Sequence, residues 1–266
     1  MTDVGDRWNA AATYEEFMGR WSRQLAARFV SWLKVPAGAH WLDVGCGTGA
    51  LTAAICAGGA PASVTGCDPA APFVEFARAH TADARASFVA AGVGTLPRRA
   101  GGYDSVTSLL ALNFFPDAGA AVHEMLALAA PRAVVSACVW DYADGMQWLR
   151  RFWDAAVSVD VAAKALDEGE RFPLCRADAL TALFSGAGLA AVRCEPLEIA
   201  TVFTSFDDYW RPFLGGTGPA PSYVASLDPE RRARLQTTLA DALTPQRDGT
   251  IGLIARAWAV RGTVTR

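Results

Sequence analysis

Three glycines follow a short apolar run at alternate positions, and this spacing can bring the backbone close to a ligand. The run at residues 40–44 leads into Gly45, Gly47 and Gly49. Glycine has no Cβ, so the chain can turn sharply here and approach a bound molecule closely. A tight turn between a strand and a helix would use glycines for the same reason, so the loop alone indicates only a candidate binding site.

Two carboxylates accompany this glycine loop. Asp43 lies two residues before the first glycine, and Asp68 follows a second apolar run. A carboxylate at the end of the second strand of a nucleotide-binding fold can accept two hydrogen bonds from a ribose diol. Asp68 could instead cap a helix that starts beside Pro69, where both residue types are favoured. Together, the loop and Asp68 predict a site for a cofactor that contains a ribose.

The residues around these motifs alternate between strand and helix patterns. Strands are predicted at 40–44, 62–67, 87–91, 103–110 and 133–140, and helices at 51–57, 72–80 and 118–129. This alternation is typical of an α/β fold, a doubly wound and mostly parallel sheet with helices on both faces. Apolar runs at 189–203 and 250–260 bring the expected sheet to seven strands. Ligands of such sheets bind at the carboxyl ends of the strands, where the glycine loop and Asp68 both lie.

Two segments outside this alternation are predicted to cover the site. Apolar residues at four-residue steps between residues 14 and 33 predict an amphipathic helix, so we expect residues 1–36 to form an N-terminal helical lid. Residues 204–248 form a long connection between the last two predicted strands, and connections of that length usually have a function. We therefore expect a cap insertion at 204–248, over the substrate site, in a main domain that comprises 37–203 and 249–266.

The loop fits S-adenosyl-L-methionine (SAM) better than a nicotinamide dinucleotide. Gly45, Gly47 and Ala50 satisfy the loose dinucleotide fingerprint. However, a diphosphate favours an uncluttered helix N-terminus, whereas Asp43 brings a negative charge beside the loop. SAM has no phosphate, and such a carboxylate can help to bind its amino group. The last two predicted strands follow a helical segment and do not form a second mononucleotide-binding half.

Several motifs resemble those of the class I, Rossmann-like SAM-dependent methyltransferases, in particular the small-molecule enzymes of ubiquinone and menaquinone biosynthesis. The matching segments are 43–49 for the first motif, 66–69 for the acidic end of the second strand, 103–106 and 112–114 for the fourth-strand motif, and 14–22 for an N-terminal helix that closes over SAM. The resemblance is specific over about residues 10–142 and general beyond them.

The resemblance implies roles for individual residues. Asp43 and the loop residues Gly45, Cys46, Gly47 and Gly49 would hold the methionine and ribose parts of SAM. Asp68 would bind the ribose hydroxyls, and Pro69 would pack on the adenine. The remaining implied cofactor contacts are Gly92 and Val93 after the third strand, Ser108 and Leu109 at the end of the fourth, and Tyr14, Arg20 and Trp21 in the lid.

Two positions depart from the family pattern. Gly92 stands where relatives often carry an aspartate that contacts the adenine amino group, and one lost hydrogen bond would weaken binding by about tenfold at most. Arg132 stands in the turn before the fifth strand, where relatives carry glycine. A left-handed backbone costs a non-glycine residue about 1–2 kcal/mol, so we expect a different turn at Arg132. Neither change excludes catalysis.

The chemistry of methyl transfer makes few demands on side chains. Transfer from a sulfonium is an in-line displacement, so the enzyme chiefly aligns the acceptor and excludes water, and it needs a general base only if the acceptor loses a proton. The three histidines lie at positions typical of structural or surface residues, so the sequence assigns no catalytic residue, and it predicts no metal site. The candidates for a substrate pocket follow strands or belong to the cap: Asn113, Trp140, Tyr142, Tyr209, Trp210 and Phe213. Aromatic residues at such spacing also occur in ordinary cores, and an aromatic lining would suit an apolar acceptor.

Composition limits the partners. Hydrophobic residues make up 52% of the 266 residues, which is enough for a sizeable core. The net charge of −3 gives no reason to expect a nucleic acid as partner. The six cysteines have no paired spacing and favour buried, reduced thiols, and no signal peptide or membrane span is visible. We expect a cytoplasmic protein without a membrane or nucleic-acid partner, which acts on a small molecule and could form a homodimer.

The leading hypothesis is a SAM-dependent methyltransferase for a small-molecule acceptor that the sequence does not identify. A SAM-binding protein without catalysis is the first alternative, because Gly92, the altered turn and the lack of an obvious base weaken the match. A nicotinamide-dependent oxidoreductase is the second alternative.

Overall fold

A computed structural model describes residues 14–216 and 218–265, and the chain divides into two compact units. The first, which we call the sheet unit, comprises Ser22–Val139, Leu174–Leu197 and Trp258–Arg266. The second, which we call the aromatic unit, comprises Met1–Trp21, Trp140–Pro173 and Glu198–Ala257. The chain therefore passes repeatedly from one unit to the other, and neither unit is a continuous segment.

Seven strands form one sheet. They are β1 (His40–Val44), β2 (Ser63–Asp68), β3 (Ala86–Ala90), β4 (Tyr103–Leu109), β5 (Ala129–Trp140), β6 (Ala190–Phe203) and β7 (Ile251–Thr263). Their order is β3-β2-β1-β4-β5-β7-β6, and the pairs β1–β2, β1–β4, β2–β3 and β4–β5 are parallel. The predicted α/β fold with a mostly parallel seven-stranded sheet is confirmed. The strand order reverses between β1 and β4, which is the kind of switch point where such sheets bind ligands.

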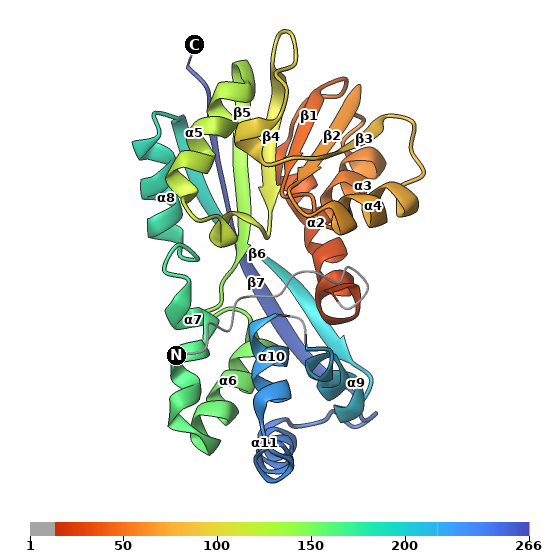
Figure 1. Ribbon diagram of the computed structural model, residues 1–266, viewed down its shortest axis with the longest axis vertical. Coiled ribbons are helices and arrows are strands. Elements are labelled where there is room, and N and C mark those ends of the chain that lie inside the picture. Colours follow the sequence, from red (N-terminus) through yellow and green to blue (C-terminus); the bar gives the residue numbers. More distant parts are fainter. Residues whose placement is uncertain (1–13, 217, 266) are drawn as a thin grey trace. The chain divides into compact units, whose positions relative to one another are not determined.

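Helices flank the strands of the sheet unit (Figure 1). They are α2 (Arg20–Leu33), which begins in the aromatic unit, α3 (Ala50–Gly58), α4 (Ala71–His80), α5 (Ala118–Leu128) and α8 (Ala177–Gly186), with the short turns η2 (Val93–Thr95) and η3 (Leu112–Phe114). Helices α3 and α4 contact β2, and α5 contacts β4. Leu25, Phe29 and Leu33 of α2 are fully buried, because their four-residue spacing places them on one face of the helix.

The start of β5 corrects one expectation. Arg132 has a φ of 63°, so it adopts the left-handed backbone that we expected a non-glycine residue to avoid. The strand register gives the reason. Between the pairs Tyr103↔Ala129 and Ser105↔Val134, β5 advances five residues while β4 advances two. The surplus residues bulge out of the sheet, and a left-handed residue turns the chain back into the ladder.

The aromatic unit is mostly helical. Its elements are η1 (Glu15–Gly19), α6 (Gln147–Val159), η4 (Val161–Leu166), α7 (Glu168–Arg171), α9 (Phe206–Trp210), η5 (Arg211–Leu214), α10 (Pro219–Ser226) and α11 (Pro229–Ala242). Helix α6 contacts α10 and α11 (Figure 1). It also contacts η4, and η5 contacts η1, α9 and α10. The helices of the connection 204–248 therefore pack with α6 and η4 from earlier in the chain. The boundaries of a lid at 1–36 and a cap at 204–248 stay predictions.

Candidate functional site

Asp43 lies near the end of β1 as a fully buried carboxyl group. Its Oδ2 accepts a hydrogen bond of 2.7 Å from the hydroxyl of Thr52 on α3, whereas its Oδ1 is buried without a partner. Burial raises the pKa of Asp43 to about 7, although the hydrogen bonds from Thr52 oppose this change. A buried oxygen without a donor is costly, and a ligand's amino group would supply that donor.

The sequence did not indicate which residue is the hydrogen-bond partner of Asp43. Thr52 is a fully buried hydroxyl residue in an otherwise apolar stretch of α3. Its position nine residues after Asp43, on the helix that follows the loop, is the signal that could have identified it. The charge argument against a dinucleotide also becomes weaker, because a carboxyl group with a pKa of about 7 is only partly ionised at neutral pH.

The three glycines of the loop all adopt left-handed backbone conformations. The φ values are 71° for Gly45, 50° for Gly47 and 88° for Gly49. At Gly45 a Cβ would also lie 2.5 Å from the Cβ of Ala111, so no larger residue fits there. The amide of Gly45 donates to the carbonyl oxygen of Cys67 at 2.8 Å, which holds the start of the loop against β2.

Asp68 ends β2 and holds the middle of the loop. Its Oδ2 accepts a hydrogen bond of 3.1 Å from the amide of Gly47, and its Oδ1 accepts one of 2.8 Å from the amide of Ala70. Helix α4 has Ala70 as its N-cap and no capping side chain, so the helix-cap interpretation of Asp68 is wrong. Burial raises the pKa of Asp68, and the two amide hydrogen bonds oppose this change. The side chain is half-buried and keeps some accessible surface beside the loop.

Cys46 contributes to the loop differently from the glycines. Its side chain is buried in a hydrophobic cluster with Val74, Ala77 and Phe88. Burial raises the pKa of its thiol far above the usual range, so the sulfur stays protonated. The thiol therefore anchors the loop to the core, and only the backbone of Cys46 is suited to contact a cofactor.

The segment after β3 carries the other departure from the family pattern. Gly92 is extended, with a φ of −74°, and its carbonyl oxygen accepts hydrogen bonds from the amide and the hydroxyl of Thr95 at 3.1 Å each. Val93 is buried. Because Gly92 has no side chain, this position offers a ligand only its amide.

The end of β4 lies beside the glycine loop, since Ala111 packs against Gly45. Ser108 is fully buried, and its hydroxyl oxygen has no partner. Leu109 ends the strand, and η3 follows with Asn113, whose two amide atoms are both buried without partners. The structure thus brings together the ends of β1, β2 and β4, as predicted, and leaves polar atoms there that a ligand can satisfy.

The predicted lid residues lie in the other unit. The guanidinium of Arg20 lies 4.3 Å above the ring of Trp21 and 4.7 Å above that of Phe203, and it pairs with Asp208 at 3.1 Å. Tyr14 precedes η1. These contacts stabilise the aromatic unit itself, and the role of the three lid residues in cofactor binding stays a prediction.

The aromatic candidates for a substrate pocket form the core of the aromatic unit. Tyr209 and Phe213 are fully buried, and Trp210, Trp140 and Tyr142 are nearly so. The ring of Phe213 lies 5.5 Å from that of Tyr209 and 6.1 Å from that of Trp210. These rings therefore pack together as core residues, and a second role in acceptor binding stays a prediction.

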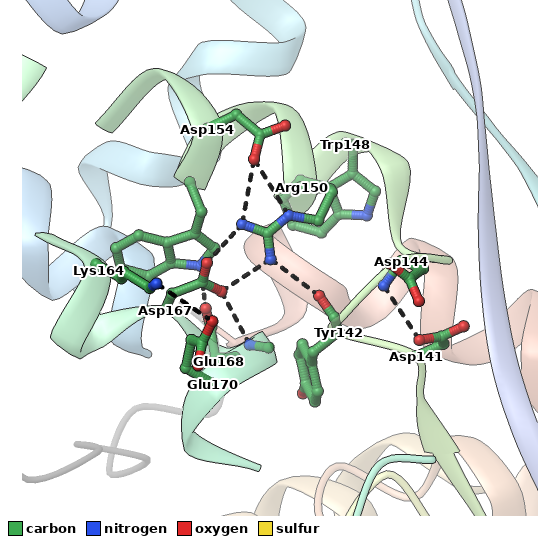
Figure 2. Close-up of polar contacts among 12 residues, drawn as sticks. Asp141, Tyr142, Asp144, Trp148, Arg150, Asp154, Lys164, Asp167, Glu168 and Glu170 are labelled. Atoms are coloured by element: carbon green, nitrogen blue, oxygen red, sulfur yellow. Dashed lines mark hydrogen bonds and ion pairs between the residues drawn. The ribbon is translucent and has the colours of Figure 1, made fainter. Parts of the chain in front are cut away.

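A polar cluster in the same unit has no counterpart in the sequence analysis. Arg150 donates to both carboxylate oxygens of Asp167, at 2.8 and 2.5 Å, and to the carbonyl oxygen of Tyr142 at 3.1 Å (Figure 2). Glu168, which follows Asp167 in the chain, is buried and accepts a hydrogen bond from the indole nitrogen of Trp153. Burial raises the pKa of Glu168 to about 8. No periodic spacing links these residues, so only the folded chain reveals them.

Residues 42–132 match the family described as methyltransferase domain. This match covers the loop, Asp68 and the end of β4, which are the parts that the geometry brings together. These residues are therefore similar to the methyltransferase domains of class I enzymes. The cofactor of this class is SAM, as the motifs predicted. No curated protein matches the sequence.

Solved methyltransferase structures share the fold. A protein of Bacillus halodurans C-125 that is assigned as a methyltransferase is 12% identical, with a TM-score of 0.56, over 90% of this chain and 97% of its own. An Anabaena variabilis protein assigned as a methyltransferase of an antibiotic biosynthesis pathway is 16% identical, with a TM-score of 0.57, over 91% of this chain and 97% of its own. Phosphoethanolamine N-methyltransferase 2 of Haemonchus contortus, solved with SAM, is 14% identical, with a TM-score of 0.59, over 100% of this chain and 58% of its own. At these identities the similarity is one of fold, and it does not transfer an acceptor.

The side chains of the methyltransferase domain fit SAM. The unpartnered Oδ1 of Asp43 can accept a hydrogen bond from an amino group, and the hydroxyl of Ser108 is also unpartnered. Asp68 holds the loop amides in place and lies at the strand end where a ribose diol is bound in folds of this kind. The site therefore offers hydrogen-bond acceptors for an amino group and for a ribose diol, and SAM has both groups. None of these contacts requires a phosphate in the ligand.

Proposed function

We propose that this protein transfers a methyl group from SAM to a small-molecule acceptor. The observation that carries the proposal is the loop of β1, in which three left-handed glycines lie between the buried Asp43 and the carboxylate of Asp68. The methyltransferase domain supports methyl transfer as the reaction. The particular resemblance to enzymes of quinone biosynthesis stays a prediction.

The proposed roles combine these observations with the family resemblance. Asp43 would bind the amino group of SAM, the loop backbone would contact its methionine and ribose parts, and Asp68 would hold the ribose hydroxyls. Pro69, Gly92 and Val93 would enclose the adenine, with Ser108 and Leu109 beside the amino group. When bound, the cofactor supplies a methyl group on a positively charged sulfur.

Asn113 is the residue of the sheet unit best placed to orient an acceptor. It follows β4, next to the loop, and its carboxamide is buried with neither its donor nor its acceptor atom satisfied. A hydroxyl or amide group of the acceptor would satisfy both atoms. Orientation is the main demand of an in-line displacement, so Asn113 would act by positioning the acceptor and not by moving a proton.

Thermal unfolding with added ligands tests the proposal. A ligand at 100 times its Kd stabilises the folded protein by about 2.7 kcal/mol, which raises the Tm of a protein of this size by about 5–10 °C. We expect this rise with SAM and with S-adenosylhomocysteine, and no rise with NADH. A rise with NADH alone would refute the proposal and favour the oxidoreductase alternative.

A SAM-binding protein without catalysis remains the competing function, because the fold does not fix the reaction. One solved structure with this fold, 15% identical and with a TM-score of 0.54, is the [4+2]-cyclase SpnF. Incubation with SAM carrying a labelled methyl group and a panel of phenols, quinones, amines and carboxylates separates the two functions. Label in any acceptor supports the enzyme, and SAM binding without labelled product supports the binding protein.

We further propose that the protein works in the cytoplasm. The six cysteines form no disulfide, and five of them are buried, as is usual in a reducing compartment. Among the residues that the structure describes, no helix has the length and apolar character needed to cross a membrane. The expected homodimer and the absence of a nucleic-acid partner also stay predictions.

A further inference from the structure

The order of the strand ends sets the direction in which SAM would lie along the sheet. Asp43 near the end of β1 would bind the amino group, and Asp68 at the end of β2 would hold the ribose. The next strand in the sheet is β3, and neighbouring strands lie about 5 Å apart (Figure 1). In SAM the base and the methionine part are attached to opposite ends of the ribose. The base would therefore extend from Asp68 toward the end of β3.

The segment after β3 begins directly beside Asp68. Asp68 and Ala90 are partners in the register of β2 and β3, and the amide of Ala91 donates to the carbonyl oxygen of Asp68 at 3.0 Å. Gly92 is the first residue beyond this hydrogen bond. All these residues belong to the sheet unit, so their arrangement involves no contact between the units. The end of the purine farthest from the ribose, which carries the 6-amino group, would thus face Gly92.

Gly92 offers this amino group no hydrogen-bond acceptor. Its carbonyl oxygen already accepts two hydrogen bonds of 3.1 Å each, from the amide and the hydroxyl of Thr95, so both lone pairs are occupied. The carboxylate of Asp68 is likewise engaged, since it accepts hydrogen bonds from the amides of Gly47 and Ala70. The amide of Gly92 can only donate, and it cannot pair with the hydrogens of an amino group.

Neither the backbone nor the packing requires a glycine at position 92. Its φ of −74° and ψ of 159° lie in the extended region that any residue adopts. Within the described residues, a Cβ at this position would have only Thr95 Oγ1 within 4 Å, at 3.9 Å, and the residue is only partly buried. Gly45 is the opposite case, because its left-handed backbone and its contact with Ala111 both exclude a side chain. The space in front of Gly92 is therefore open, and an aspartate would fit there.

The acid that packs against the next turn contacts a different residue. Glu124 of α5 lies beside η2, where a Cβ at Gly94 would be 3.7 Å from its Cγ and 3.8 Å from its Cδ. In the described part of the chain, no carboxylate atom lies within 4 Å of the Cβ position of Gly92. Glu124 therefore does not replace a side chain at position 92.

From these observations we infer that the protein does not recognise the 6-amino group of adenine, and that Gly92 leaves the base subsite unable to distinguish adenine from a purine without this group. The inference rests on the proposed function, since it concerns the cofactor of the same site. An amino group that the protein does not bind keeps its hydrogen bonds to water, so its removal changes the affinity little. Gly92 thus determines specificity through the side chain that it lacks.

Isothermal titration of the full-length protein with two ligands tests the inference. The ligands are S-adenosylhomocysteine and its 6-deamino analogue, in which purine replaces adenine and the ring nitrogens are unchanged. We expect the two Kd values to agree within about twofold. A site that accepts a neutral hydrogen bond from the amino group would instead bind the deamino analogue about two- to tenfold more weakly.

Two substitutions at position 92 provide the matched comparison. Gly92→Asp supplies a charged acceptor, so this variant should bind S-adenosylhomocysteine at least about threefold more tightly than the deamino analogue. Gly92→Ala adds a Cβ without an acceptor and should show no preference, as in the wild type. The extended backbone suits both residues, so both variants should fold. Glu124→Gln should also leave the ratio of the two Kd values unchanged.

A wild-type preference of more than twofold for S-adenosylhomocysteine would overturn the inference, and its loss in Glu124→Gln would assign the recognition to Glu124. The inference also fails if Gly92→Asp gains no preference, because residue 92 would then not face the amino group. A wild type that binds neither ligand would refute the proposed function itself. Binding of S-adenosylhomocysteine with a clear preference would leave that function intact and refute only the role of Gly92.

Discussion

Replacing Asp43 with asparagine should make the protein more stable and its cofactor binding weaker at the same pH. Asp43→Asn keeps an oxygen that can accept the hydrogen bond from Thr52, so the packing around this fully buried side chain is preserved. The variant removes the charge and puts an amide nitrogen in place of the unpartnered Oδ1. The two opposite effects arise because the carboxylate is poorly solvated in the free protein but has a cationic partner in the complex.

The magnitude follows from the pKa of Asp43, which burial raises from its ordinary 3.8 to about 7. The folded state thus retains a proton that the unfolded chain releases between these two values. The stability contributed by this group is complete below pH 3.8, falls as the pH rises, and is lost above pH 7. At about 1.4 kcal/mol for each pH unit, the loss amounts to roughly 4 kcal/mol. The asparagine variant has no such dependence and should melt about 8–15 °C above the wild type at pH 8.

Thermal unfolding at pH 5.5 and pH 8 measures the stability, and isothermal titration with SAM measures the affinity. A hydrogen bond between charged groups contributes about 1.5–3 kcal/mol, so the variant should bind SAM about 10- to 100-fold more weakly at pH 8. Asp241→Asn changes the net charge equally at an exposed position of α11 and should alter neither quantity. The reasoning is refuted if Asp43→Asn is less stable than the wild type at pH 8, or if it binds SAM with unchanged affinity.

Three further perturbations probe the loop and the buried acid of the aromatic unit. Asp68→Ala removes the carboxylate that holds two loop-side amides, so the SAM-induced rise in Tm should disappear; an unchanged Kd in titration would assign Asp68 a purely structural role. Gly45→Ala combines a φ of 71° with a Cβ only 2.5 Å from that of Ala111, so it should destabilise the fold by at least about 2 kcal/mol in urea unfolding. The control Gly188→Ala, at a φ of 84° with open space around it, should destabilise the fold by about 1 kcal/mol. Equal losses of stability would show that the close contact with Ala111 does not matter. Glu168 has a pKa raised from 4.5 to about 8, so its stabilising contribution falls as the pH rises between these values, and Glu168→Gln should gain stability over the wild type from pH 6 to pH 9; a constant difference in urea unfolding would contradict this.

The sheet unit was largely predictable because its signals are local. The mostly apolar run at 40–44 became β1 with the same bounds, since a strand buried on both faces consists mainly of apolar residues, and the buried Asp43 is its exception. Gly45 and Gly49 were expected to let the chain turn sharply, and both have positive φ values. The prediction for Arg132 was wrong, because a register shift between β4 and β5 imposes its left-handed backbone, and no local sequence pattern indicates that shift.

The buried polar groups were not predictable. Sequence spacing identifies Asp43 but does not reveal that one of its oxygens is paired with Thr52 and the other is not. Asp68 was open to two interpretations, and only the backbone conformation around Ala70 excluded the helix cap. Trp148 and Thr201, whose buried donors lack partners, carry no motif at all, because an unpaired donor is defined by what surrounds it and not by its neighbours in sequence.

The sequence by itself determined the fold class, the glycine loop and the acidic residue at the end of the second strand, because each depends on residues close together in the chain. The tertiary structure alone decided which polar atoms are satisfied and how far burial shifts their pKa values. These properties depend on contacts between distant segments, such as α6 and β6, where the rings of Trp148 and Phe203 lie 6.3 Å apart, and on the exclusion of water from them.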